Sequence, residues 1–215
     1  MKNRLAEHLS DALLLLIDRH LHKLFSIIFS MNILKNNHVL LASGLIVVAG
    51  LSRLAPHPGN FTAVGAMAIF AGNVLPKRWS FVLPILALWL SDLLLNNIIY
   101  REYYPTFSLI PSTLLVTYLP MLLVWGMSNL TLKTAKPSSI MATSLLGSVL
   151  FFLVSNFFVW AGASHVYSPN FSGLMVCYTA GLPFLLNQIA GDLFFCGLLF
   201  GMYSFAQNRL QLAKV

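Results

Sequence analysis

Six apolar segments, separated by short polar connections, follow one another from residue 39 onward. A helix needs roughly 20 apolar residues to cross the hydrocarbon core of a bilayer, and most of the segments approach or exceed that length. The pattern therefore predicts an all-α, polytopic membrane protein with six transmembrane helices. The predicted segments cover about 39–55, 61–76, 80–98, 108–128, 140–162 and 176–203.

The second segment is short for a membrane-crossing helix and rich in small residues. Small side chains allow two helix backbones to approach closely inside a membrane. We expect this helix to be tilted, partly re-entrant or buried among its neighbours. The small residues are Ala63, Gly65, Ala66, Ala68, Ala71 and Gly72.

Composition supports a membrane protein. Hydrophobic residues make up 58% of the chain and charged residues 9%, with a mean hydropathy of +0.78. Soluble domains carry about 25% charged residues, so this chain lacks the residues for a water-exposed surface. The formal net charge is +7, but the basic residues stand in ones and twos between apolar segments. This arrangement indicates membrane topology and argues against a nucleic-acid partner.

The chain divides into three parts. Residues 1–37 mix charged residues with short apolar runs, and we expect either an amphipathic helix on the membrane surface or a weakly constrained extension. Residues 38–207 form the predicted six-helix transmembrane domain, and residues 208–215 a tail.

Basic residues also predict the orientation. Eleven Lys and Arg residues lie on the side of the two termini, whereas Arg53 and Arg101 lie on the other. Positive residues are enriched on the cytoplasmic side of membrane proteins. The pattern predicts a multi-pass membrane protein with both termini in the cytoplasm.

After residue 37 the chain contains three acids, of which Glu102 lies in a polar loop and Asp92 and Asp192 in apolar segments. A carboxylate inside a membrane helix is costly unless it faces a cavity or a partner. Each aspartate therefore either binds a ligand, a cation or a proton, or serves as a buried structural anchor. For Asp192, Asn187 and Gln188 are one turn away and offer structural hydrogen bonds.

Several polar residues are predicted at the same outer level as Asp92. A polar hairpin at residues 56–60 follows the first helix, and a Trp and an Asn share one face at the outer end of the fifth helix. An aromatic ring beside amide and imidazole groups suits a small polar ligand. The candidate substrate-binding residues are Arg53, His57, Asn60, Asp92, Asn156 and Trp160.

Catalysis and cofactors receive no support from the sequence. It contains no His-Glu-x-x-His spacing for a metal, no phosphate-binding loop, no nucleophile elbow and no Cys-x-x-Cys. The residues before Asp192, Ile189-Ala190-Gly191, lack the first glycine of the Gly-x-Gly-Asp pattern of intramembrane aspartyl proteases. We therefore expect neither an enzyme nor a bound cofactor or metal.

Four stretches resemble a family of uncharacterised bacterial membrane proteins known as a domain of unknown function. They are RLAPHPGNFTAVGAMAIFA (53–71), LPILALWLSDL (83–93), SNFFVW (155–160) and LPFLLNQIAGDLFFCGLLFG (182–201). That family is similar to the substrate-binding S-components of energy-coupling-factor vitamin transporters. The resemblance implies a six-helix bundle of the bacterial cytoplasmic (inner) membrane that binds a vitamin-like molecule, with a transmembrane coupling subunit and ATPases as partners. The Ala-x-x-x-Ala contact motif common in the first helix of S-components is absent from residues 39–55.

Three functions remain open at this point. The first is a protein that binds or imports a small molecule through an outward-facing polar site, for which Asp92→Asn should lower binding or uptake at least tenfold. The second is a stand-alone carrier coupled to protons or cations through Asp92 and Asp192. The third is a non-transporting structural membrane protein in which both aspartates only lock helix packing.

Overall fold

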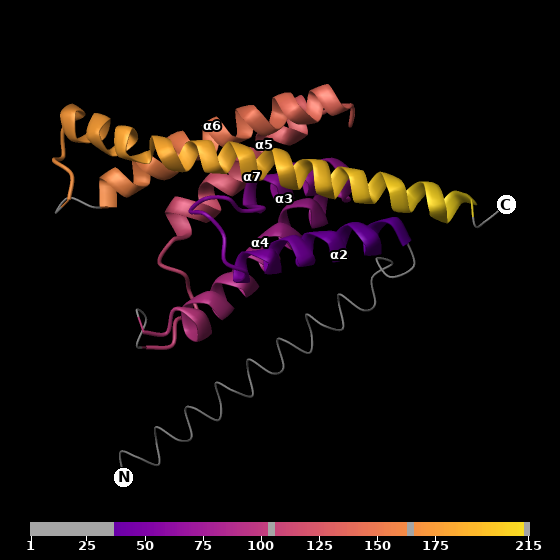
Figure 1. The fold of residues 1–215 in the computed structure, drawn as a ribbon, viewed down its shortest axis with the longest axis horizontal. Coiled ribbons are helices and arrows are strands. Elements are labelled where there is room, and N and C mark those ends of the chain that lie inside the picture. Colours follow the sequence, from indigo (N-terminus) through magenta and orange to yellow (C-terminus); the bar gives the residue numbers. More distant parts are fainter. Residues whose placement is uncertain (1–36, 103–105, 163–165, 213–215) are drawn as a thin grey trace, which may run out of the picture. The chain divides into compact units, whose positions relative to one another are not determined.

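The computed structural model describes residues 37–102, 106–162 and 166–212, with side chains described as far as Arg209. Within these ranges the chain is helical and contains no strand. Figure 1 shows the helices α2 (Asn37–Leu51), α3 (Val64–Val74), α4 (Lys77–Leu94), α5 (Leu119–Thr131), α6 (Pro137–Gly162) and α7 (Phe171–Leu212). A 3-10 turn, η1 (Ser52–Leu54), follows α2 directly, and two wider π-type turns are η2 (Leu95–Ile99) and η3 (Leu114–Tyr118). Residues 41–215 form one compact unit.

Five helical segments are long and apolar enough to cross a membrane by length and composition. The remaining helix, α3, has 11 residues, which makes it about 16 Å long and shorter than the roughly 30 Å hydrocarbon core. The all-α prediction is therefore confirmed, and the short second segment is the helix that differs from the rest. The five segments are Asn37–Leu54, Lys77–Ile99, Leu114–Thr131, Pro137–Gly162 and Phe171–Arg209.

Helix α3 lies at the centre of the bundle. It packs against α4, α5, α6 and α7, and all its residues from Val64 to Ala71 are buried. Of the three arrangements expected for the second apolar segment, the structure shows burial among neighbours. The physical reason is the size of the side chains, since Gly65, Ala66 and Ala68 let four helices approach one short axis.

Helix α7 is longer than the sequence pattern predicts. It runs over 42 residues, or about 63 Å at 1.5 Å per residue, which is about twice the thickness of the hydrocarbon core. Its last turns lie beyond the predicted end of the apolar segment at residue 203, so the predicted tail from residue 208 begins inside the helix. A helical backbone satisfies its own hydrogen bonds in water as well as in lipid, and it does not have to end where the apolar residues end. Apart from Asn37, the predicted N-terminal part lies outside the described residues.

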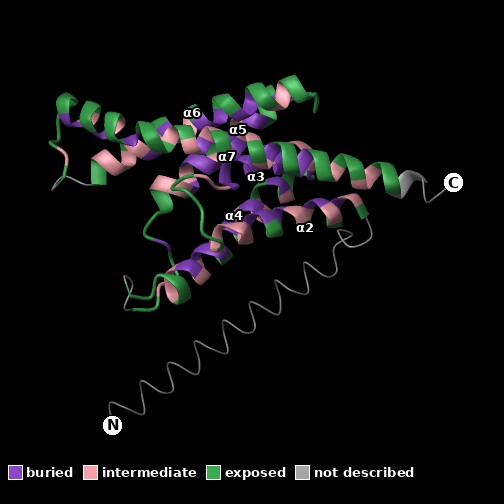
Figure 2. Ribbon diagram, in the orientation of Figure 1, coloured by how far each residue is buried: buried purple, intermediate pink, exposed green. Residues whose placement is uncertain are grey.

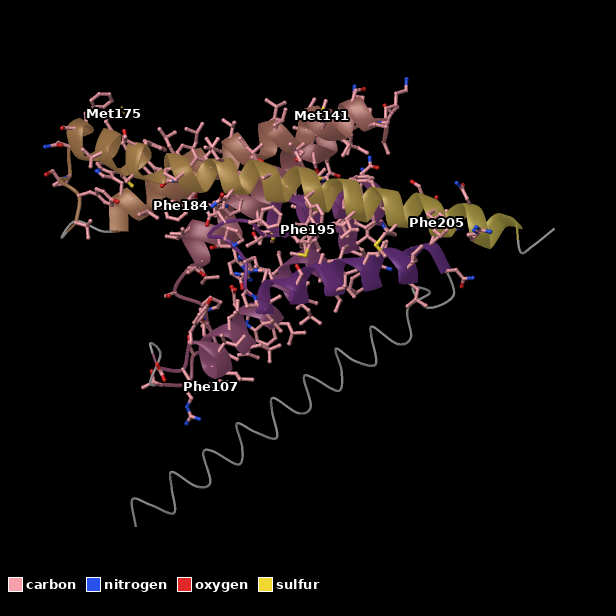
Figure 3. The ribbon with its side chains drawn as sticks, viewed as in Figure 1. Phe107, Met141, Met175, Phe184, Phe195 and Phe205 are labelled. Carbon is pink, nitrogen blue, oxygen red and sulfur yellow. The ribbon has the colours of Figure 1, made fainter. Side chains whose placement is uncertain are left out.

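Exposed residues, green in Figure 2, follow the long helices, and many of them are large and apolar. Met141 of α6, Met175 and Phe205 of α7 and Phe107 of the loop before η3, all labelled in Figure 3, are between 41% and 74% exposed. Soluble monomers rarely expose apolar surface on this scale. The exposed apolar side chains therefore support placement of these helices in a bilayer.

Close packing of α3 on α5 leads to a first prediction, which concerns Gly72. A Cβ atom at Gly72 would lie 2.6 Å from Ser128 Oγ and 3.0 Å from Asn129 Nδ2. The Ser128 hydroxyl is already held by the Trp125 carbonyl at 2.8 Å. Overpacking of this kind costs about 1–3 kcal/mol, so Gly72→Ala should lower the thermal unfolding midpoint in detergent.

Gly126 of α5 is the matched control, because a Cβ there meets no atom within 4 Å. Alanine is more stable than glycine in a helix by about 0.5–1 kcal/mol. Gly126→Ala should therefore keep or raise the unfolding midpoint. Equal midpoints for the two variants would contradict the close α3–α5 packing.

Candidate functional site

The polar hairpin after α2 is built by its own sequence. The Phe61 N–H donates to the Pro58 carbonyl at 3.0 Å and closes a tight turn. Asn60 occupies the third position of that turn with φ at 63°, a left-handed conformation that Asn adopts more readily than most residues. The turn leads the chain into the buried α3, and it holds Asn60 beside the start of that helix.

Arg53 and Asp92 form an ion pair. Arg53 Nη1 donates to Asp92 Oδ1 at 2.6 Å and to Ser91 Oγ at 2.7 Å. The second carboxylate oxygen, Oδ2, accepts a 2.8 Å hydrogen bond from the Tyr118 hydroxyl. The Arg53 and Asp92 side chains are 14% and 7% exposed. The charge of Asp92 is thus matched by a cation, and the pair joins η1, α4 and η3.

A cavity of about 390 Å³ lies next to this pair. Arg53 lines it, whereas Asp92 does not. Its wall is formed by the hairpin and the start of α3, by η3, by α6 and by α7. The polar lining residues relevant to binding are Arg53, Asn60, Thr117, Asn156, Gln188 and Asp192. Val116, Phe151, Val159 and Phe184 are among the apolar ones, and Phe184 is labelled on α7 in Figure 3.

Asp192 is the least exposed polar residue of the lining, at 1%. Ser148 Oγ donates to Oδ2 at 2.8 Å, and the Ala66 backbone N–H donates to Oδ1 at 3.2 Å. The Gln188 side chain is a further hydrogen-bond partner. All these groups are neutral. A Cβ at Gly65 would overlap the carboxylate, so the absence of a side chain there makes room for it.

Gln188 carries an unsatisfied acceptor. Its side chain belongs to the cavity lining and is 5% exposed. Its Oε1 atom is buried and has no hydrogen-bond partner among the described residues. Because buried polar atoms are nearly always hydrogen-bonded, an unpaired one beside a cavity indicates a missing donor.

The structure brings together some of the predicted site residues. Arg53, Asn60 and Asn156 line the cavity, together with Asp192. Asp92 lies directly behind Arg53. Asn156 Nδ2 donates to the Phe152 carbonyl at 2.9 Å, and a Cβ at Gly181 would lie 2.6 Å from Asn156 Oδ1.

Three other predicted residues lie outside the lining. His57 is exposed, and its Nδ1 lies 2.9 Å from the Pro58 carbonyl oxygen. Trp160 Nε1 donates to the Ser168 carbonyl at 3.0 Å, which ties the end of α6 to the following loop. Asn187 Nδ2 donates to the Gly59 carbonyl at 3.0 Å. Asn187 therefore holds the hairpin, and the hydrogen bond expected from it to Asp192 is not the one it makes.

Sequence reasoning missed Tyr118 and Ser148, the side chains that bond the two aspartates. A tyrosine inside the fourth apolar segment was a usable signal, because a buried hydroxyl normally has a partner. Ser148 gave no comparable signal, since serine is common in membrane helices. Its single hydroxyl proton can be donated either to Asp192 Oδ2 or to the Ser144 carbonyl oxygen, which lies 3.0 Å from Oγ.

Comparison with known proteins relates the chain to a described family. The model of a family of unknown function (DUF6580) matches residues 33–213. No curated protein and no solved structure matches the chain.

The Arg53–Asp92 pair leads to a second prediction. Asp92→Asn keeps the shape of the side chain but leaves the Arg53 guanidinium without a counter-charge. Breaking a buried ion pair lowers the free energy of unfolding by about 3–5 kcal/mol. Because Arg53 is partly exposed to solvent, we expect a loss at the lower end of this range. The midpoint of thermal unfolding in detergent should fall clearly.

Two further variants serve as controls. Tyr118→Phe removes one hydrogen bond to a charged group, worth about 1.5–3 kcal/mol, and should lower the midpoint less. The double variant Arg53→Gln with Asp92→Asn removes both charges and should be more stable than Asp92→Asn alone. A double variant less stable than Asp92→Asn would show that the ion pair does not carry the effect.

Proposed function

Because the chain belongs to a family of unknown function (DUF6580), we propose its role from the cavity: a membrane protein that binds or imports a small polar molecule. The single observation that carries the proposal is the cavity itself. It brings Arg53, Gln188 and Asp192 to one partly open space between apolar helices.

Its dimensions and chemistry support this proposal. The volume of about 390 Å³ falls in the range of about 300–1,000 Å³ typical of small-molecule sites. Such sites combine apolar walls with a few converging polar groups. Here Phe151, Val159 and Phe184 supply apolar surface, and the buried Gln188 Oε1 lacks a donor.

A specific form of this proposal follows from the resemblance to S-components of vitamin transporters. In that form the ligand is a vitamin or a precursor, and a transmembrane coupling subunit with ATPases drives its release. Because residues 39–55 lack the Ala-x-x-x-Ala contact motif, we assign binding to this chain and leave the energy source to experiment.

We propose a binding role in preference to catalysis, on the arrangement of the two aspartates. Intramembrane aspartyl chemistry needs two carboxylates that share a proton. Here Asp92 is bonded to Arg53 and Tyr118, whereas Asp192 is bonded to Ser148 and Ala66. The two carboxylates thus occupy separate hydrogen-bond networks.

A second candidate function is a stand-alone carrier coupled to protons or cations. The observation in its favour is Asp192, whose hydrogen-bond partners are all neutral. Asp92, the other acid proposed for such a carrier, is neutralised by Arg53, so Asp192 would be the coupling group.

The third prediction concerns ligand binding. A thermal-shift screen of the purified protein over vitamins, their precursors and metal ions should identify a compound that raises the unfolding midpoint. Gln188→Met, which removes the buried acceptor at similar volume, should weaken the affinity for that compound at least tenfold. Thr179→Val is the control on the same helix, because Thr179 is exposed and its hydroxyl donates to the Met175 carbonyl of its own helix.

The outcomes of this experiment separate the candidates. If no compound shifts the midpoint, the binding proposal fails. If a compound is found and purified protein in liposomes accumulates it along an imposed ion gradient without ATPase subunits, the carrier is the correct function. Equal affinities of Gln188→Met and Thr179→Val would exclude Gln188 from the site.

The fourth prediction concerns orientation. We propose that both termini are cytoplasmic, since eleven of the thirteen basic residues lie on their side. The hairpin with His57 then faces outward. In whole cells, a cysteine introduced at exposed His57 should react with a membrane-impermeant maleimide, whereas one at Lys133 should react only after the membrane is opened.

Both positions are exposed in the structure, and the native Cys177 and Cys196 are buried. The reverse labelling pattern would invert the orientation. It would also place the proposed site on the cytoplasmic side.

A further inference from the structure

The charges around the cavity do not balance. Arg53 is the cationic side chain of the lining and Asp192 the anionic one. Arg53 is already paired with Asp92, which lies outside the lining. With Asp192 ionised, the three groups together leave one negative charge, which belongs to Asp192.

Neutral donors offset only part of the cost of this charge. Keeping an unpaired carboxylate ionised in an apolar interior is expensive, and the ionised form normally requires a counter-charge as well as hydrogen bonds. Ser148, the Ala66 N–H and Gln188 supply the hydrogen bonds. A positively charged group in the cavity would supply the missing counter-charge.

The surroundings of Asp192 also define the kind of group that fits. The carboxylate is held by donors from α3 and α6, and it lies against Gly65 of α3. Gln188, one turn earlier on α7, adds an acceptor that has no partner among the described residues. Two adjacent acceptors call for a group with at least two N–H donors, as in an ammonium or amidinium ion.

Arg53 indicates the other end of the ligand. Its two hydrogen bonds to other described residues both come from Nη1. Nε and Nη2 donate to no group within the part of the chain that the structure describes. The guanidinium is thus anchored by one nitrogen and has donors left for a neutral oxygen acceptor, while its charge stays matched by Asp92.

The size of the cavity favours an organic cation over a bare metal ion. A volume of about 390 Å³ is much larger than one ion, and Phe151 and Phe184 provide apolar surface for a carbon skeleton. Among the described residues no group of three or more His, Cys, Asp or Glu side chains could hold a metal.

We infer that the cavity takes a small organic monocation, whose ammonium or amidinium N–H groups bind Asp192 and Gln188 and whose oxygen acceptor binds Arg53. This inference rests on the proposed binding function, and it specifies the chemical class of the ligand. It assigns different roles to the two aspartates, since Asp192 binds the ligand and Asp92 positions Arg53.

The test compares pairs of probes that differ in charge but little in shape. Isothermal titration calorimetry on the purified full chain would use 4-methoxybenzamidinium against 4-methoxybenzamide, and 4-methoxyphenethylammonium against 4-methoxyphenethyl alcohol, so that every probe carries an oxygen acceptor for Arg53. At least one cation should bind tenfold or more tightly than its neutral counterpart. The 4-methoxyphenyltrimethylammonium ion, which carries the charge without N–H groups, should bind more weakly than that cation. These comparisons need only the wild-type protein.

Variants then show which residues produce the preference for cationic over neutral probes. Asp192→Asn should abolish the tenfold preference, and Gln188→Met should weaken binding of the cation, while Thr179→Val should leave both unchanged. A circular dichroism spectrum and an unfolding midpoint of each variant show whether it is folded. If Asp192→Asn does not fold, the wild-type probe pairs and Gln188→Met still decide the question.

Each remaining outcome is decisive. If neutral and cationic probes bind equally, or if a neutral or anionic compound from the wider screen binds while the cations do not, the inference is wrong and the binding function stands. If sodium chloride displaces the cationic probes and choline chloride at the same concentration does not, Asp192 binds an inorganic cation and the inference is also wrong. If neither the probes nor the screened compounds bind, the proposed function fails as well.

Discussion

The burial of a carboxylate among apolar helices is the constraint on which this structure depends. Asp192 of α7 is 1% exposed, and its oxygens are reached by Ser148 of α6 and by the backbone of α3. An unsatisfied carboxylate in this environment would cost several kcal/mol. The three helices must therefore keep their relative positions for the Asp192 carboxylate to remain hydrogen-bonded. The hydrogen bonding of this acid and the packing of the three helices thus depend on each other.

Small residues make this arrangement sterically feasible. Helix α3 is buried along nearly its whole length, and the acid approaches it at Gly65, where a side chain would collide with the carboxylate. The same device recurs at Gly181, which leaves space for the Asn156 side chain. In a bilayer, where apolar surface alone gives helices little reason to associate, close contact and hydrogen bonds supply the stabilisation.

The two intramembrane aspartates solve the same problem in different ways. Asp92 has a cation and a hydroxyl as partners, so its charge is used within the protein and fixes the orientation of Arg53. Asp192 has only neutral partners and lines a cavity. On this difference rests the proposal that Asp92 positions Arg53, whereas Asp192 in its ionised form binds the ligand. The family match identifies relatives of unknown function, so the chemistry of the site is the basis for assigning a role.

The sequence by itself determined the class of the protein and much of its secondary structure. Apolar segment length and low charge are local properties, and they predicted helices, a short second segment and costly acids at Asp92 and Asp192. They also selected Arg53, Asn60 and Asn156, which line the cavity.

Only the tertiary structure decided which polar groups meet. Asn187 and Gln188 are neighbours on α7 that point about 100° apart, and the rotation of α7 against its partners directs Gln188 to Asp192 and Asn187 to the hairpin. The same packing pairs Asp92 with Tyr118 and leaves His57 and Trp160 outside the cavity. Helix rotation and separation result from the fit of whole side-chain surfaces, which no local pattern in the chain encodes.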